Sequence, residues 1–271
     1  MALPISRNQL DRLGERLAAS DTPSEDDQAL LLQVLRAYED ALRTVRVHLL
    51  GLGFTVTGRL KTIGTLVDKL RREPGMRLKS VQDVAGLRIV VPGTRRDQDE
   101  VVARVVAAFA AEAKPPVVRD RRILPSSGYR AVHVVVFESR LPVEVQVRTK
   151  QQDLWAQVFE RLGDRWGRTI RYGGFPDEPD MIALEGDPPV TRRQVVQRMQ
   201  RLSGEIDRFE RVKLAMLDVE DGLAAYSGDR DDEEYFALAT DWRESRAAIA
   251  EGEASLSDTL TSFLRYATQE A

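Results

Sequence analysis

Apolar and polar residues alternate over residues 142–149, which predicts a β-strand whose two faces differ in chemistry. The residues of the two faces are Val143, Val145 and Val147 on one, and Glu144, Gln146 and Arg148 on the other. Residues 128–136 predict a partner strand with Tyr129, Ala131 and His133 on one side, and the connection between the strands has hairpin length. An acid, an amide, a guanidinium, a phenol and an imidazole would then share one sheet surface, which is typical of a functional site.

Periodicity elsewhere predicts both helices and strands. Apolar residues at helical spacing indicate helices at 26–50, 62–72, 97–113, 154–166, 191–219 and 233–268. Short β-branched or apolar runs indicate strands at 54–57, 84–91 and 117–119. Because helices and strands alternate in the first part of the chain and only helices follow, we predict an α+β fold. A mixed sheet of about five strands would be flanked by helices, with a long N-terminal helix and a helical C-terminal extension.

These elements divide the chain into four predicted parts. They are an N-terminal helical segment at 1–52, a central α+β domain at 53–172, a loop or linker at 173–190 and a helical extension at 191–271. The linker is rich in glycine, proline and acidic residues, which disfavour regular structure.

Composition restricts the class of protein. Apolar residues make up 42% and charged residues 31% of the chain, as in ordinary globular proteins. No apolar run approaches the roughly 18 residues that cross a bilayer, and the N-terminus lacks the apolar stretch of a signal peptide. We therefore expect a cytoplasmic protein without a membrane segment. The absence of cysteine excludes thiolate metal sites, and two histidines, His48 and His133, are too few for a polyhistidine site.

The net charge of −3 conceals a segregation of charge along the chain. Residues 59–79 contain seven basic side chains against two acids, and residues 114–150 contain eight against three. Residues 218–234 contain eight acids against one arginine. The two basic stretches surround the polar strands, which indicates a phosphate-rich ligand, although solvated helix faces would give the same counts.

Five short segments carry most of this polar chemistry, over roughly residues 55–170. They are Arg59-Leu-Lys61 with Lys69, Asp83-Val-Ala-Gly-Leu-Arg88-Ile, Arg119-Asp120, Gly128-Tyr-Arg-Ala-Val-His133 and Glu144-Val-Gln-Val-Arg-Thr149. In kind and in order these segments resemble the synthetase domain of the RelA/SpoT alarmone synthetases. The resemblance implies a nucleotidyltransferase-like fold. It also implies Mg²⁺-dependent transfer of the β,γ-pyrophosphate of ATP to the 3′-hydroxyl of GDP or GTP, which makes the alarmone (p)ppGpp.

The resemblance also implies a role for each residue of the five segments. The donor-binding residues would be Arg59, Lys61, Lys69 and Arg88; the acceptor-binding residues Tyr129, His133, Gln146, Arg119 and Arg121; and the catalytic and metal-binding residues Asp83 and Glu144. The physical chemistry of each group fits its role. Planar guanidinium groups can sandwich adenine, ammonium groups neutralise phosphate, and carboxylates suit Mg²⁺. Glu144 could also accept the proton of the attacking hydroxyl.

Three of these polar side chains have further implied roles. Tyr129 would stack on the acceptor base, and Gln146 would orient either Glu144 or the ribose. Arg148 would serve either as a substrate contact or as an internal strut paired with a carboxylate.

Two positions depart from the family pattern. Members commonly carry a lysine four residues before the stacking tyrosine and an asparagine two residues before it, where this chain has Pro125 and Ser127. The acceptor-phosphate site would be weaker unless Arg121 or Arg122 substitutes. Two alternatives therefore stay open: a toxin-like relative that pyrophosphorylates the 3′ end of tRNA or adenosine nucleotides, and a catalytically silent nucleotide-binding protein with the same fold.

The resemblance covers only a synthetase activity. Bifunctional relatives carry an N-terminal hydrolase domain with His-Asp metal ligands, whereas this chain has no His-Asp dipeptide and only about 55 residues before the first motif. We therefore expect a small, single-activity synthetase. The apolar stripes of the C-terminal helices predict either a homo-oligomer interface or packing on the synthetase domain.

Overall fold

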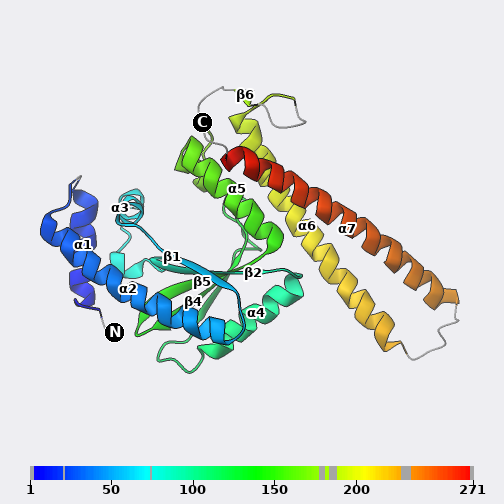
Figure 1. Cartoon of the computed structure of the whole chain (residues 1–271), viewed down its shortest axis with the longest axis horizontal. Coiled ribbons are helices and arrows are strands. Elements are labelled where there is room, and N and C mark those ends of the chain that lie inside the picture. Colours follow the sequence, from blue (N-terminus) through cyan, green and yellow to red (C-terminus); the bar gives the residue numbers. More distant parts are fainter. Residues whose placement is uncertain are drawn as a thin grey trace. The chain divides into compact units, whose positions relative to one another are not determined.

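Figure 1 shows the computed structural model of the chain, which describes residues 3–20, 22–73, 75–176, 181–182, 188–226 and 233–268. The helices are α1 (Arg7–Ala19), α2 (Glu25–Gly51), α3 (Ile63–Arg72), α4 (Arg95–Ala108), α5 (Lys150–Trp166), α6 (Arg192–Ala225) and α7 (Glu233–Thr268), with 3₁₀ helices at Leu78–Ser80 and Arg168–Tyr172. The strands are β1 (Val56–Leu60), β2 (Ala85–Val91), β3 (Val117–Asp120), β4 (Val132–Glu138), β5 (Leu141–Thr149), β6 (Met181–Ile182) and β7 (Val190–Thr191).

The fold is α+β, as predicted, with a mixed five-stranded sheet in the order β1-β2-β5-β4-β3. β1 pairs antiparallel with β2, and β4 pairs antiparallel with β5. In the second ladder His133 lies opposite Gln146, so these two polar side chains share one face of the sheet, as predicted. Ser139 and Arg140 form the connecting turn with φ of 49° and 68°, the positive-φ geometry that follows the twist of two-residue hairpins.

The chain packs into two compact units. The first consists of Met1–Val90, Glu100–Arg119 and Val132–Val147, and the second of Val91–Asp99, Asp120–Ala131 and Arg148–Ala271. The predicted linker falls in the second unit. Within it, β6 pairs antiparallel with β7. Residues 177–180 and 183–187 lie outside the described part of the chain, as do residues 227–232 of the acidic stretch at 218–234.

In the first unit, α2 packs on the sheet through contacts with β1 and β4 (Figure 1). Its buried side chains include Leu31, Val34, Tyr38 and Val45, which recur at helical spacing. The side chain of Ser24 caps the helix, and three acids in the first turn complement the helix dipole. The predicted helix at 26–50 is therefore confirmed.

Helix α1 was not predicted from the apolar pattern. Ser6 and Gln9 form a capping box at its start, and Leu10, Leu13 and Leu17 are buried. The helix packs on α3 and on the 3₁₀ helix that precedes β2. The signal was present in the sequence as Ser-x-x-Gln followed by leucines at helical spacing.

In the second unit, α5, α6 and α7 share one apolar core, and α6 and α7 run side by side (Figure 1). Trp155 is 2% exposed, and its indole Nε1 donates a hydrogen bond to the carbonyl oxygen of Met199 at 2.6 Å. The prediction that the apolar stripe of residues 154–166 is core is confirmed, because Val158 and Leu162 are also buried.

Several predicted boundaries were wrong; α6, for example, continues to Ala225, past the predicted end at residue 219. α4 ends at Ala108, where the prediction ran to residue 113, and β4 begins at Val132 instead of residue 128. β1 extends to Leu60 because Gly58 continues the strand. A side chain at Gly58 would come within 2.5 Å of Leu87, so this glycine marks close packing between strands, not the end of one.

Among the described residues, no helix combines the length with the apolar character that crossing a bilayer requires.

Candidate active site

Lys61, Lys69 and Asp83 form one cluster in the first unit. The Nζ atom of Lys61 lies 3.1 Å from Oδ2 of Asp83, and the Nζ atom of Lys69 lies 2.9 Å from Oδ1. One carboxylate therefore holds two ammonium groups next to each other. Two adjacent cations are what the phosphates of a donor nucleotide require for neutralisation.

The local sequence explains how these three side chains meet. Thr62 caps α3 by accepting a hydrogen bond from the N–H of Thr65, so the chain passes from β1 into the helix directly after Lys61. The backbone N–H of Lys61 donates to the carbonyl oxygen of Val84 at 2.9 Å, which brings the segment before β2 alongside. Lys69 then approaches from the last turn of α3.

The two lysines set the charge state of Asp83. Burial raises the pKa of this carboxyl, but the charges and hydrogen bonds of Lys61 and Lys69 outweigh burial and hold the pKa below its ordinary value. Asp83 is therefore an anion at neutral pH, as a ligand of a hard cation must be.

Glu144, Gln146 and His133 form a second cluster on the β4–β5 ladder. The Nδ1 atom of His133 lies 2.9 Å from Oε1 of Glu144, and the amide of Gln146 donates to Oε2 of Glu144 at 2.8 Å. Glu144 is 8% exposed. Burial raises its pKa, yet the hydrogen bonds and charge of its neighbours bring the pKa below the ordinary value. The side chain of Gln146 therefore contacts Glu144, while its role at the acceptor stays a prediction.

Asp83 and Glu144 are close enough to influence each other. The charge of Asp83 adds to burial in raising the pKa of Glu144. Among the described residues, no group of three or more His, Cys, Asp or Glu side chains is arranged to hold a metal ion. Two carboxylates still fit Mg²⁺, because this ion is commonly held by one or two carboxylates together with substrate phosphates and waters.

Arg59 and Arg88 lie on one face of the β1–β2 ladder. Arg59 is opposite Gly86, and Arg88 is opposite Thr57, so the two arginines are diagonal neighbours across the strands. Diagonal neighbours are about 7–8 Å apart, which leaves room for one planar base between two guanidinium groups.

Tyr129 belongs to the second unit, where Arg148 fixes it. The Nη2 atom of Arg148 donates to the Tyr129 hydroxyl at 3.0 Å, and its guanidinium carbon lies 5.0 Å from the centre of the ring. Arg148 is buried and also donates to Oδ1 of Asp153 at 3.0 Å. Arg148 therefore acts as an internal strut, which was one of its two predicted roles.

The prediction that Tyr129 lies on a strand was wrong. Ser127 and Gly128 have φ of 51° and 91°, and the N–H of Tyr129 donates to the carbonyl oxygen of Ser126 at 2.9 Å. Left-handed residues close a tight turn here and end any strand that would start at residue 128. Side-chain alternation therefore does not extend from His133 to Tyr129, and their joint role at the acceptor stays a prediction.

Arg121 and Arg122 were the two candidates for the missing acceptor cation. Arg122 already forms two ion pairs, because its guanidinium lies 2.6 Å from Asp120 and 2.7 Å from Asp99. Arg121 is exposed, and its backbone N–H donates to the carbonyl oxygen of Ala131. Of the two, Arg121 is the one whose side chain is available to a ligand.

The basic stretch at residues 114–150 is less available to ligands than its charge suggests. Arg122, Arg130 and Arg148 all pair with carboxylates inside the second unit. Arg119, in the first unit, is exposed. The charge count therefore overstated the positive surface of this stretch.

The buried polar residues of α6 were not among the predicted site residues; they are Ser203, Asp207 and Glu210. They continue the buried stripe that Met199 and Ile206 define. The signal in the sequence was the presence of polar residues on the helix face that the apolar pattern marks as buried. Polar groups are seldom buried without partners, so residues at such positions indicate polar contacts inside the protein.

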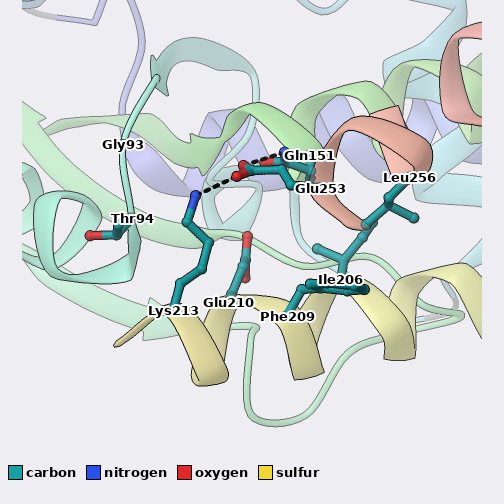
Figure 2. A pocket seen from close by; sticks show the side chains of 9 residues that line it. All are labelled: Gly93, Thr94, Gln151, Ile206, Phe209, Glu210, Lys213, Glu253 and Leu256. Carbon is teal, nitrogen blue, oxygen red and sulfur yellow. Dashed lines mark hydrogen bonds and ion pairs between the residues drawn. The ribbon is translucent and has the colours of Figure 1, made fainter. Parts of the chain in front are cut away.

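Figure 2 shows a small pocket whose lining comes from α5, α6, α7 and the turn before α4. Its lining residues are Gly93, Thr94, Gln151, Ile206, Phe209, Glu210, Lys213, Glu253 and Leu256. Lys213 and Gln151 each contact Glu253 at 2.7 Å, as the dashed lines mark. None of the predicted site residues lines this pocket, so we do not assign it to the substrates.

Known proteins resemble this chain in both sequence and fold. The model of the region found in RelA / SpoT proteins matches residues 58–162. An uncharacterised protein of Mycobacterium tuberculosis strain H37Rv is 34% identical over 215 residues, which cover 76% of this chain and 75% of the relative. GTP pyrophosphokinase YjbM of Bacillus subtilis is 26% identical over 168 residues, which cover 57% of this chain and 74% of the relative.

A solved structure agrees with these sequence matches. The small alarmone synthetase 1 of Bacillus subtilis, bound to its product pppGpp, is 26% identical, with a TM-score of 0.50 over 69% of this chain and 95% of that chain. The chain therefore belongs to the RelA/SpoT family, and the resemblance stated from the five motifs is confirmed.

Proposed function

We propose that this protein transfers pyrophosphate from ATP to the 3′-hydroxyl of GDP or GTP and so makes (p)ppGpp. The 3′-oxygen attacks the β-phosphorus of ATP, the bond from that phosphorus to the oxygen bridging to the α-phosphate breaks, and AMP leaves. The observation that carries the proposal is the Lys61–Asp83–Lys69 cluster, with Glu144 in electrostatic range, inside the RelA/SpoT region. The relatives named as a GTP pyrophosphokinase and a small alarmone synthetase support the same reaction.

Basic side chains of the first unit would bind the donor, ATP. Lys61 and Lys69 would bind the β- and γ-phosphates, leaving Asp83 as these anions arrive. Arg59 and Arg88 would hold adenine between their guanidinium planes. Binding at four points aligns the β-phosphorus for attack, and alignment supplies much of the rate in phosphoryl transfer.

Asp83 and Glu144 would hold Mg²⁺ when the nucleotides bind. The ion would neutralise charge that develops on the transferring group. Both carboxylates are ionised at neutral pH, since both have a lowered pKa. Glu144 can in addition accept a hydrogen bond from the 3′-hydroxyl and take its proton as the new bond forms.

The acceptor would be bound by one aromatic ring and several polar side chains. Tyr129 would stack on the guanine, and His133 and Gln146 would contact phosphate or ribose. Arg119 and Arg121, which are exposed, would supply positive charge for the acceptor phosphates. ATP and GTP are abundant in the cytoplasm, where we expect the protein to act.

A transfer assay tests the proposal. ATP labelled in its β-phosphate is incubated with GDP or GTP and Mg²⁺, and the labelled products are separated. The wild type is expected to form labelled guanosine tetra- or pentaphosphate, and Glu144→Gln is expected to lose this product. Label that stays in ATP while both nucleotides bind would overturn the proposal.

A further inference from the structure

The residues on both sides of Tyr129 are held by α6. The hydroxyl of Ser203 donates to the carbonyl oxygen of Gly128. Arg130 donates from Nε to the carbonyl oxygen of Ser203 at 3.2 Å and to its hydroxyl oxygen at 3.1 Å. A single serine of α6 thus contacts the residue before Tyr129 and the residue after it.

Asp207, one helical turn after Ser203, also contacts the segment around Tyr129. Its Oδ1 accepts a hydrogen bond from Nη1 of Arg130 at 3.1 Å, and the same carboxylate contacts Arg95 and Arg211. Burial raises the pKa of Asp207, but its arginine neighbours outweigh burial and hold the pKa below the ordinary value. A nearly buried carboxylate with several guanidinium partners resists displacement, because separation would leave charges unpaired.

Space around the turn is also restricted. Gly128 has φ of 91°, and a side chain there would come within 2.8 Å of Trp155 and 3.2 Å of Ser203. The ring of Tyr129 is fixed in turn by Arg148. Both the backbone and the side chain of Tyr129 are therefore set by contacts within the second unit.

We propose that Ser203 and Asp207 are positioning residues for the acceptor base and act through Tyr129. The inference rests on the proposed function, which assigns base stacking to Tyr129. A stacking surface that is already ordered binds more tightly, because less conformational freedom is lost on binding. α6 lies beyond residues 58–162, the region that the family model matches. The helical extension thus contributes to acceptor binding by holding Tyr129 in place.

Binding measurements on single variants test the first consequence. Titration calorimetry gives the affinity for GDP and, separately, for a non-hydrolysable ATP analogue. Asp207→Asn and the milder Ser203→Ala are each expected to weaken GDP binding by about fivefold or more, a fraction of what base stacking contributes. The affinity for the ATP analogue is expected to stay unchanged, and the KM for GDP is expected to rise more than kcat falls.

Asp218→Asn is the matched control. It removes the same charge from the same helix, at a side chain that is 70% exposed and contacts Arg96. GDP affinity is expected to match the wild type. Equal losses for GDP and the ATP analogue in Asp207→Asn and Ser203→Ala would indicate general damage and overturn the inference.

A double-mutant cycle with Tyr129→Ala tests whether the effect passes through Tyr129. If it does, Ser203→Ala costs no further GDP affinity in the Tyr129→Ala background. Additive losses would contradict a positioning role. The binding readout separates this inference from the proposed function: a wild type that binds GDP without transferring label refutes the function alone, whereas a wild type that does not bind GDP refutes both.

Discussion

His133 and Glu144 lie next to each other on the β4–β5 ladder, with Nδ1 of the histidine 2.9 Å from Oε1 of the acid. The pair joins a predicted acceptor contact to a predicted catalytic group. Since burial by itself would raise the pKa of Glu144, the histidine is the main reason that this pKa is lowered. The charge state of the acid therefore depends on the imidazole.

His133→Ala is expected to raise the pKa of Glu144, because burial then dominates. The acid limb of the kcat/KM profile against pH should move to higher pH, since this profile reports the free enzyme. Gln146→Ala removes a weaker contribution and should move the limb less. An acid limb that stays in place in His133→Ala would contradict this account.

The same pair affects stability at low pH. Because the folded pKa of Glu144 lies below its ordinary value of 4.5, the unfolded chain binds the proton first as the pH falls. The stabilisation is fully present above about pH 4.5 and is lost as the pH drops through the folded pKa. Urea unfolding at a series of pH values should show this loss in the wild type and a reduced loss in His133→Ala.

Asp83→Asn should separate donor binding from turnover. Without Mg²⁺, Asp83 competes with phosphates for Lys61 and Lys69, so the variant is expected to bind ATP severalfold more tightly in EDTA. With Mg²⁺, transfer should fall by about a hundredfold or more, because the carboxylate ligand is lost.

Fluorescent-nucleotide titration in EDTA and the transfer assay measure the two effects of Asp83→Asn. Glu39→Gln, an exposed position on α2, removes the same charge and should change neither. Weaker ATP binding in EDTA for Asp83→Asn would contradict the competition between the carboxylate and the phosphates.

Ser127→Asn is expected to stabilise the protein by up to about 1 kcal/mol, because asparagine tolerates the left-handed conformation better than serine. Ser127 has φ of 51°, and the family commonly has asparagine there. Thermal unfolding measures the change. Ser126→Asn, at a neighbouring position without positive φ, should give no gain, and a destabilised Ser127→Asn would refute the backbone explanation.

Pro125→Lys is expected to lower the KM for GDP by a few-fold and to do so most at low salt. The substitution restores a cation where the family commonly has one, and surface charge attraction is screened by salt. Leu124→Lys, at an adjacent residue that is 80% exposed, adds the same charge one position away and serves as the control. An equal effect from both variants would indicate general attraction and not a specific phosphate contact.

The elements that local pattern determines were predictable from the sequence. The alternation of valines with Glu144 and Gln146 predicted β5, and helical spacing predicted α2 and α5. The polar side of the β4–β5 ladder followed from pairing, because Gln146 lies opposite His133. These features depend on residues close together in the sequence or on one hairpin.

Features that depend on distant partners were not predictable. Arg130 was counted as part of a basic stretch. Its partners Ser203 and Asp207 lie 73 and 77 residues further along the chain, so no local pattern shows that its charge is paired. A strand was predicted from residue 128 because nothing about Ser127 in the sequence indicates a left-handed backbone there. Burial of Arg148 likewise depends on packing in the second unit, and no local pattern reports such packing.

The most direct test of the proposed function is a competition among acceptors. ATP labelled in its β-phosphate is offered GDP, GTP, unlabelled ATP and bulk tRNA in parallel reactions with Mg²⁺, each repeated with Glu144→Gln. We predict label in guanosine tetra- and pentaphosphate, attached at the 3′-oxygen, and its loss in the variant. Label in tRNA or in adenosine nucleotides instead, or no transfer to any acceptor while ATP and GDP still bind, would contradict the function proposed for this protein.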